Sequence, residues 1–274
     1  RKTFDAKGID YVSDLALLNV KDLKTIVQWN NEMGIKLFRL SSQIFAWSDE
    51  YKLSDLKDYD EICSMMLEIG KIATDANQRL TMHPGPYNCL ASPNQKVVEK
   101  TIRELNCHSE QFNMLGFKPS NYNKINIHVG GAYGDKKGTL ERFCKNFELL
   151  NDDTKKRLVI ENDDSPNEYS VKDLFDGIYQ TIGIPITFDY FHHKFNTGGL
   201  TEEEALKMAA ITWPEGIAQC CHYSESRRKE KLDESIRPQA HSDIIYEKIQ
   251  TYGLEPDIVI EAKLKEQAIF NRVI

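Results

Sequence analysis

The segment Thr187-Phe188-Asp189-Tyr190-Phe191-His192-His193 changes its chemical character halfway along its length. It begins with β-branched and aromatic residues, which are typical of a buried strand. It continues with Asp189, His192 and His193, whose side chains are good metal ligands, and a loop with Gly198 and Gly199 follows. One such strand end is weak support for a metal site. However, five other strand-like runs of this chain also end in His or Glu.

Short strand-like runs alternate with amphipathic segments along the whole chain. The amphipathic segments, such as residues 14–33, carry apolar residues at helical spacing, whereas the strand-like runs are short and rich in branched apolar residues. Strands are expected at residues 36–40, 79–82, 125–128, 157–161, 185–189, 217–222 and 257–261. Helix-capping signals are Ser92 with Pro93 and Gln95, Ser170 with Asp173, and Thr201 with Glu204, and a last helix is expected near residues 242–252.

The strict alternation, without a linker, predicts one α/β domain over residues 1–274 with a parallel sheet. A length of 274 residues is close to the usual size of a (β/α)8 TIM barrel. Such a barrel needs eight strands, and only seven are expected here. Either the barrel is open, or the first strand is missing from the chain. We expect the second.

Composition and net charge do not decide whether the protein binds nucleic acid. The formal net charge of −7 disfavours contacts with phosphates, which usually need a basic surface. Divalent cations bound by the carboxylates could nevertheless reverse the sign of the charge at the mouth of a site. Six cysteines without a C-x-x-C pair suggest a reducing compartment. With no signal-peptide pattern and no long apolar run, we expect an intracellular monomer, cytoplasmic or nuclear, without a membrane partner.

The strand ends and the loops after them hold a set of imidazoles and carboxylates. In a TIM barrel the functional side chains lie at this end of the strands. The candidate ligands are His83, His128, Glu161, Asp189, His192, His222, His241 and Glu261. A single His at a strand end is more often a structural residue, but their coincidence on one face favours metal binding. Imidazole with carboxylate suits Zn²⁺, Mn²⁺ or Fe²⁺, and these groups exceed the needs of one ion, so two or three ions are expected.

Several motifs resemble those of the UV damage endonucleases. They are RLSSQIF at 39–45, MHPG at 82–85, HVGGAYGDKKG at 128–138, IEND at 160–163, FDYFHH at 188–193, CHYSES at 221–226, AHSDII at 240–245 and IEAKLKEQA at 260–268. The resemblance covers nearly the whole chain in the same order. It implies a TIM barrel related to endonuclease IV, with a cluster of divalent metals, often manganese. It also implies cleavage of DNA immediately 5′ of ultraviolet photoproducts, which leaves a 3′-hydroxyl and a 5′-phosphate.

The resemblance also implies roles for the candidate ligands. His83, His128 and Glu161 would form one metal site, and Glu161 would bridge to a second ion. Asp189, His222 and Glu261 would hold that second ion, and His192 with His241 a third. His193 would support a metal ligand or have a structural role rather than bind a metal itself. Mn²⁺ is the expected metal, with Zn²⁺ and Mg²⁺ as alternatives.

One catalytic position departs from the family. Two residues before His222, members commonly have a lysine, reported as carboxylated and placed at the metals; this chain has Cys220. A thiolate there could bind metal but is softer than a carbamate, and a buried inert thiol is the alternative. Glu161, His222 and Cys220 are therefore the expected catalytic positions, with the third metal site altered or weak.

Damaged double-stranded DNA is the partner that the resemblance implies. After His-Pro-Gly the family often has Gln and Tyr, which probe the lesion; this chain has Pro86 and Tyr87. The expected DNA contacts are Tyr87, Lys136, Lys137, Arg227, Arg228, Lys229 and Lys263, although a solvated loop explains many such charge runs. The alternatives are an abasic-site endonuclease of the endonuclease IV type, a sugar isomerase or epimerase, and a lesion-binding protein without cleavage.

Overall fold

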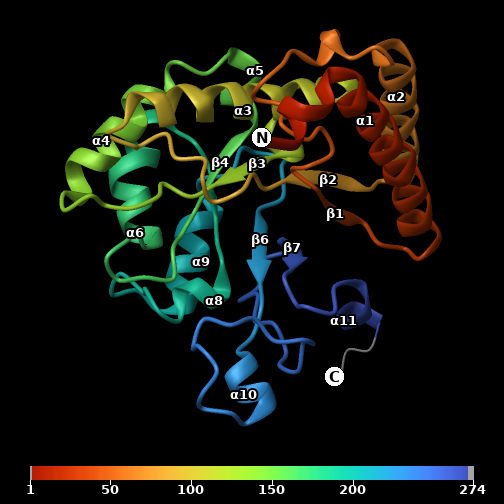
Figure 1. Cartoon of the computed structure of the whole chain (residues 1–274). Coiled ribbons are helices and arrows are strands. Elements are labelled where there is room, and N and C mark those ends of the chain that lie inside the picture. The colour runs from red at the N-terminus through yellow and green to blue at the C-terminus, as the bar shows by residue number, and fades with distance from the viewer. Residues whose placement is uncertain (1, 271–274) are drawn as a thin grey trace. The chain divides into compact units, whose positions relative to one another are not determined.

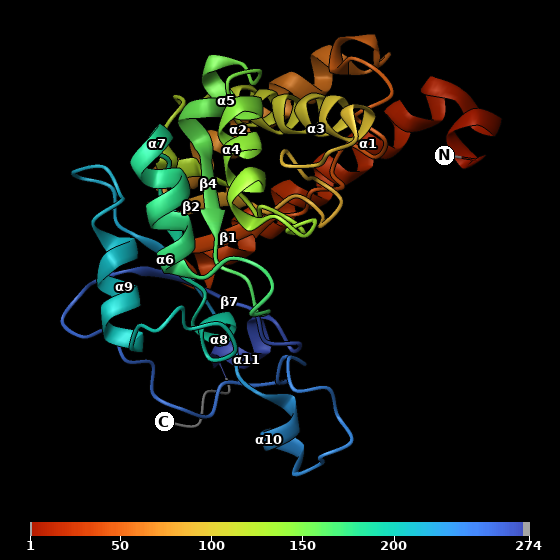
Figure 2. The same ribbon diagram turned by 90° about the vertical axis from the view of Figure 1, so that its left-hand side faces the viewer.

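The computed structural model describes residues 2–270. These residues form two compact units. The first runs to Ile127 and includes Lys145–Leu158, and the second comprises His128–Cys144 and the described residues from Val159 onward. Each unit combines helices with short parallel strands (Figures 1 and 2).

The first unit is built on three parallel strands. β1 (Leu37–Leu40) pairs with β2 (Arg79–Met82) along its whole length, and Met82 of β2 pairs with Ile125 of β3 (Ile125–Ile127). The helices of this unit are α1 (Lys2–Glu32), α2 (Tyr59–Asp75), α3 (Gln95–Met114) and α5 (Asp152–Arg157), with the short turns η1 (Leu53–Asp55) and η2 (Asn121–Asn123). α1 and α2 pack side by side because each buries an apolar stripe at helical spacing (Figure 1).

The second unit holds two further parallel pairs. In β4 (Leu158–Glu161) and β5 (Ile186–Thr187), Glu161 pairs with Thr187; β6 (Cys220–Tyr223) and β7 (Asp257–Ile260) pair along their whole length. A parallel bridge between Asp189 and His222 connects the two pairs. The remaining helices are α4 (Lys136–Phe147), α6 (Val171–Leu174), η3 (Phe175–Tyr179), α7 (Gln180–Ile182), α8 (Tyr190–His193), α9 (Glu202–Ala210), α10 (Arg227–Lys231) and α11 (Glu266–Phe270). α6 and α9 lie next to each other in both views (Figures 1 and 2).

All seven expected strands occur among the described residues, close to their predicted positions. Two expected capping boxes are confirmed, at Ser170 with Asp173 before α6 and at Thr201 with Glu204 before α9. The helix predicted over residues 14–33 corresponds to the C-terminal part of α1, whose backbone departs from helical geometry at Gly8 (φ 73°, ψ −175°). The eighth strand and the single domain stay predictions.

The predicted start of α3 is wrong. The helix begins at Gln95, and Asn94 is its N-cap, because the Asn94 side chain accepts a hydrogen bond from the Lys96 N–H at 3.0 Å. The Ser92 hydroxyl accepts instead from the Asn94 N–H, at 3.1 Å, and so stabilises the turn before the helix.

The helix predicted near residues 242–252 is also wrong. That segment is irregular in the structure. The backbone N–H groups of Tyr246 and Glu247 donate to the buried Glu225 carboxylate, each at 2.8 Å, rather than to carbonyl groups one helical turn earlier. The six cysteines form no disulfide. No helix among residues 2–270 is both long and apolar enough to cross a bilayer.

Candidate metal centre

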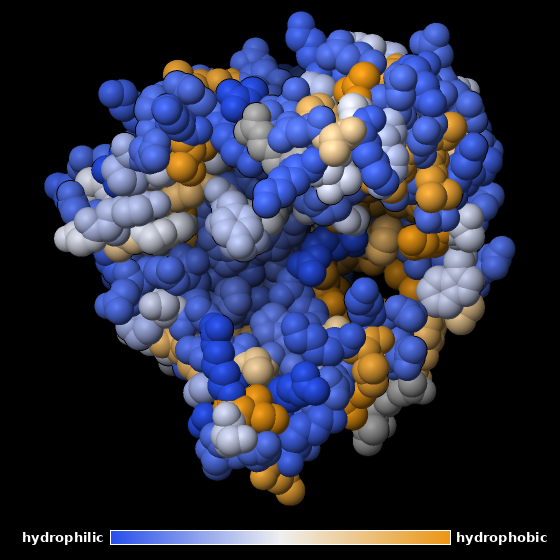
Figure 3. All heavy atoms as spheres, viewed as in Figure 1, coloured by the Kyte–Doolittle hydropathy of each residue, from blue (hydrophilic) through white to orange (hydrophobic). Residues whose placement is uncertain are grey.

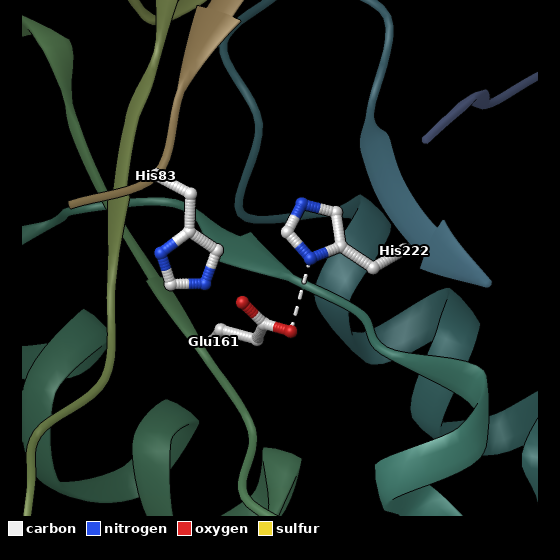
Figure 4. Close-up of side chains that lie close together, drawn as sticks. All are labelled: His83, Glu161 and His222. Atoms are coloured by element: carbon white, nitrogen blue, oxygen red, sulfur yellow. Dashed lines mark hydrogen bonds and ion pairs between the residues drawn. The ribbon is translucent and has the colours of Figure 1, made fainter. Parts of the chain in front are cut away.

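Glu161 lies at the centre of the polar cluster in the second unit. It ends β4, a strand whose four residues are all buried, and its side chain is only 1% exposed. The His222 Nδ1 atom on β6 lies 3.0 Å from Glu161 Oε1, and Figure 4 shows this contact as a dashed line. Buried parallel strands therefore bring the carboxylate and the imidazole together from distant parts of the sequence.

The first group of candidate ligands consists of His128, Glu161 and His192, whose ligand atoms all lie within 4.8 Å of one another. His128 Nε2 lies 3.6 Å from Glu161 Oε2, and His192 Nδ1 lies 3.7 Å from Glu161 Oε1. Both distances are too long for a strong hydrogen bond. One carboxylate and two imidazoles at this spacing are the donor set of a transition-metal or zinc site.

Contacts behind the ligands orient both imidazoles of this group. His128 Nδ1 lies 2.7 Å from Asp163 Oδ1, and His192 Nδ1 lies 2.8 Å from the Asn162 carbonyl oxygen. With Nδ1 engaged in this way, the Nε2 atom of each ring is left as the ligand atom. The orienting roles of Asn162 and Asp163 were not predicted from the sequence. The available signal was that both residues follow Glu161 in the IEND motif.

The second group consists of Asp189, His222 and Glu261, whose ligand atoms also lie within 4.8 Å of one another. His222 Nδ1 is 3.3 Å from Glu261 Oε1. Asp189 Oδ1 caps α8 by accepting from the His192 N–H at 2.7 Å, whereas the buried Asp189 Oδ2 has no hydrogen-bond partner among the described residues. A buried carboxylate oxygen without a donor is costly, and a cation would stabilise it. The donor set therefore fits a divalent metal.

The pKa values of the candidate ligands are shifted because several ionisable groups are buried close together. Burial opposes a charge on His128, but Glu161 and Asp163 outweigh it and raise its pKa to about 10. Burial likewise opposes a charge on His192, but Asp189 and Glu161 raise the pKa of that residue to about 9. Burial raises the pKa of Asp189 to about 7, although His192 works in the opposite direction. Without metal, protons balance the carboxylates of this cluster, and a metal ion would displace them.

Three other sequence-predicted residues lie outside both groups. His241 Nδ1 is 3.1 Å from the Glu261 carbonyl oxygen, and burial lowers the pKa of this histidine. His193 is buried against the Phe188 ring, with centroids 5.3 Å apart, in keeping with a structural role. Cys220 is buried at the start of β6. Metal binding by His241 and catalysis by Cys220 stay predictions.

His83 belongs to the first unit, where it follows β2 (Figure 4 labels it). Its ring is partly buried, and its Nδ1 atom lies 3.0 Å from the Pro84 carbonyl oxygen. An imidazole held in this way keeps Nε2 as its ligand atom. The role of His83 in the first metal site stays a prediction.

The basic residues near α10 differ in what they contact. Arg228 is used internally, because its Nε donates to the Ile236 carbonyl at 2.7 Å and its Nη1 pairs with Glu234 at 2.9 Å. Arg227 lies 3.7 Å from Asp243, whereas Lys229 is exposed. Hydrophilic side chains predominate over α10 and the loops around it (Figure 3).

The two lysines at the start of α4 also differ. Lys136 donates to the Pro166 carbonyl at 3.1 Å and lies 3.6 Å from Asp173. The Lys137 side chain is 89% exposed, and its nearest carboxylate, Glu141, is 3.9 Å away. Lys263, which follows β7, is exposed as well. Lys137, Lys229 and Lys263 are thus the predicted phosphate contacts with the most accessible ammonium groups.

The fold resembles solved TIM-barrel structures of different activities. Endonuclease IV from Thermus thermophilus aligns with a TM-score of 0.56 at 14% identity, covering 87% of this chain and 86% of that one. D-psicose 3-epimerase from Clostridium cellulolyticum aligns with a TM-score of 0.59 at 13% identity, covering 87% and 78%. At these identities the similarity shows the α/β barrel-type fold alone.

Closer relatives show the family. The crystal structure of SacUVDE aligns with a TM-score of 0.82 at 32% identity, over 94% of this chain and 85% of that chain. A UV-damage endonuclease from Schizosaccharomyces pombe is 38% identical over 98% of this chain, and one from Neurospora crassa is 34% identical over 97%. The chain spans less than half of these two relatives, 45% and 42% of their lengths. The family model described as UV-endonuclease UvdE matches residues 2–273, so the chain belongs to the UV-endonuclease UvdE family.

Proposed function

We propose that this chain is the catalytic part of a metal-dependent DNA repair endonuclease. It hydrolyses the phosphodiester bond immediately 5′ to ultraviolet photoproducts, such as cyclobutane pyrimidine dimers and 6-4 photoproducts, and leaves a 3′-hydroxyl and a 5′-phosphate. Family membership supports this activity, and the relatives from Schizosaccharomyces pombe and Neurospora crassa carry the description UV-damage endonuclease. We expect the chain to act as a monomer.

The position of Glu161 is the observation that carries the proposal. It belongs to the ligand group with His128 and His192, and it contacts His222 of the second group at 3.0 Å. Two ligand groups in direct contact with each other suit two neighbouring ions, and paired ions are a common solution for phosphodiester hydrolysis. We propose two or three bound ions, with Mn²⁺ preferred over Zn²⁺ or Mg²⁺.

The protein side chains have defined tasks in this reaction. Bound divalent cations would supply Lewis-acid activation of water and of the phosphodiester group. Glu161 and Asp189 supply anionic oxygens that offset the charge of the cations, and Asp163 holds His128 in orientation from behind. His222, fully buried, takes its orientation from Glu161. Side chains that are buried and held by such contacts would need little rearrangement during the reaction.

DNA binding requires a positive contribution that the net charge of −7 does not supply. Lys137, Lys229 and Lys263 are exposed and would neutralise backbone phosphates. Tyr87, with 90% of its surface exposed, would stack on a base at the lesion. Selection of damaged sites would follow from the lower cost of unstacking a damaged dinucleotide.

A plasmid nicking assay tests the proposal. Irradiated and unirradiated supercoiled plasmids are incubated with the protein and Mn²⁺, and conversion to the open circle is followed on a gel. We expect nicking of the irradiated plasmid and its loss in the Glu161→Gln variant, while Glu141→Gln, at an exposed position of α4, retains it. Absence of damage-dependent nicking by the wild-type protein would refute the proposal.

Defined substrates separate the alternatives. Duplex oligonucleotides with one photodimer or one abasic site distinguish an endonuclease for photoproducts from one of the endonuclease IV type. Epimerisation of keto-sugars, together with inertness towards both duplexes, would assign the chain to the sugar epimerases whose fold it shares.

Cys220 favours a second candidate, a lesion-binding protein without cleavage. It is buried at the start of β6, at the position where family members commonly have a lysine. This candidate predicts binding of the irradiated duplex without nicking, and nicking gained by Cys220→Lys. Nicking by the wild-type protein excludes it.

A further inference from the structure

The loop after β2, in the first unit, changes from exposed to buried between two consecutive residues. The Tyr87 side chain is 90% exposed, whereas the next residue, Asn88, is only 6% exposed. An aromatic ring that extends freely into solvent would lose conformational freedom on stacking against a base. Contacts that hold the backbone next to Tyr87 therefore influence how strongly the ring can bind a base.

Asn88 connects this loop to α3. Its side-chain Nδ2 donates to Glu104 Oε1 at 2.8 Å and to the Gly85 carbonyl at 3.2 Å, and its backbone N–H donates to the same carbonyl at 3.1 Å. The next N–H, of Cys89, donates to the Thr101 hydroxyl at 3.0 Å. Two positions of α3 thus hold the chain directly after Tyr87.

Glu104 is an unusual choice for this face of α3. Its side chain is 19% exposed, and its Oε1 lies 3.7 Å from Nε2 of the fully buried His108. Burial would raise the pKa of Glu104, but the nearby His108 imidazole and the hydrogen bond from Asn88 outweigh it and lower the pKa. The residue is therefore a charged acceptor at neutral pH.

A carboxylate in this position needs a reason beyond packing. An apolar side chain of similar size would avoid the desolvation cost of the charge. A charge-assisted hydrogen bond, in contrast, holds its donor more firmly than a neutral one does. The donor here is Asn88, one residue from the ring proposed to contact the lesion.

We infer that Glu104 is a positioning residue for lesion recognition: its carboxylate holds Asn88 and, through it, the exposed ring of Tyr87. The inference rests on the proposed function, because the contact of Tyr87 with the lesion is part of that proposal.

The test is a double-variant comparison of lesion preference. The measured quantity is the ratio of dissociation constants for a sound duplex and a duplex with one photodimer, with the full chain and Mn²⁺. We expect Glu104→Ala and Tyr87→Ala each to lower this ratio by about tenfold. The variant with both changes should be no worse than Tyr87→Ala alone, since Glu104 acts through that ring.

Two further variants separate positioning from general stability. Glu104→Gln keeps an acceptor oxygen for Asn88 and should restore most of the preference. Glu99→Ala removes an exposed carboxylate from the same helix and should change nothing. An unchanged ratio in Glu104→Ala, or losses that add in the double variant, would overturn the inference.

Hydrogen exchange provides a readout without DNA. The N–H groups of Asn88 and Cys89 should exchange about tenfold faster in Glu104→Ala than in the wild type, with no such change in Glu99→Ala. Unchanged exchange would overturn the inference. If Glu104→Ala does not fold, Asn88→Ala removes the other end of the same hydrogen bond. If the wild type shows no preference for the photodimer duplex, the proposed function fails, whereas the exchange rates still decide whether Glu104 holds the loop.

Discussion

Replacement of Glu161 by glutamine removes one charge from the centre of the ligand cluster and preserves the size of the side chain. In the wild type the Glu161 carboxylate lies 3.0 Å from His222 Nδ1, 3.6 Å from His128 Nε2 and 3.7 Å from His192 Nδ1. The amide of glutamine cannot balance cations or protonated imidazoles. We therefore expect the Glu161→Gln variant to lose at least two ions.

The magnitude follows from these distances. A partner behind a metal ligand usually contributes about 10- to 100-fold in metal affinity, so a direct ligand should cost at least about 100-fold for each ion, or about 3 kcal/mol. The metal-free protein should change as well. At 3.6 Å a carboxylate stabilises the His128 imidazolium by about 5 kcal/mol at an effective dielectric constant of about 20. The pKa of His128, about 10 in the wild type, should therefore fall markedly.

Elemental analysis after dialysis against Mn²⁺ measures the bound ions, and an NMR titration of the metal-free protein follows the imidazole of His128. Glu141→Gln, on the exposed face of α4, is the matched control. Unchanged metal content in Glu161→Gln would refute the shared role of Glu161. An unchanged pKa of His128 would refute the electrostatic part of the reasoning.

Three further outcomes are expected. The pKa of His128 is raised to about 10, and only the neutral imidazole binds metal, so Mn²⁺ binding at pH 7.5 should release protons and weaken as the pH falls. Calorimetry in two buffers with different heats of ionisation measures this proton release. Equal binding heats in the two buffers would contradict the prediction. Asp163→Asn should weaken Mn²⁺ binding by about 10- to 100-fold in the same titration, since it removes the carboxylate 2.7 Å from His128, and an unchanged affinity would contradict that role. Gly70→Ala should lower the free energy of unfolding by about 3 kcal/mol in a denaturant titration, because the new Cβ would lie 1.7 Å from the Leu115 carbonyl oxygen. Gly131→Ala is the control and should have little effect, because its Cβ would meet no atom within 4 Å.

Local patterns were sufficient to locate the strands and to single out the candidate ligands, whose metal binding stays a prediction. The seven strands were predictable because each is a short run rich in apolar residues and bounded by polar or helix-forming residues. The ligand candidates were predictable because parallel strands place their C-terminal residues at one edge. The capping boxes at Ser170 and Thr201 were predictable for a similar reason, since each depends on residues only three positions apart.

Predictions failed where a nearby or distant side chain competed for the same backbone groups. Asn94 rather than Ser92 caps α3, because it places its oxygen within reach of the Lys96 N–H. Over residues 242–252 the Glu225 carboxylate takes the N–H groups that a helix would need, and it lies more than 20 positions away from Tyr246. The pattern of apolar residues along the chain gives no information about such competition for backbone N–H groups.

The sequence by itself determined the kind of chemistry, imidazoles and carboxylates at the ends of buried strands. The tertiary structure alone decided how these groups combine within the second unit. It grouped His128 and His192 with Glu161 and brought His222 to the same carboxylate across 61 positions of sequence. It also left Asp189 with one oxygen capping α8 and the other without a donor among the described residues. The physical reason is that strand identity depends on neighbours along the chain, whereas a metal site depends on distances of a few ångströms between residues that only folding brings together.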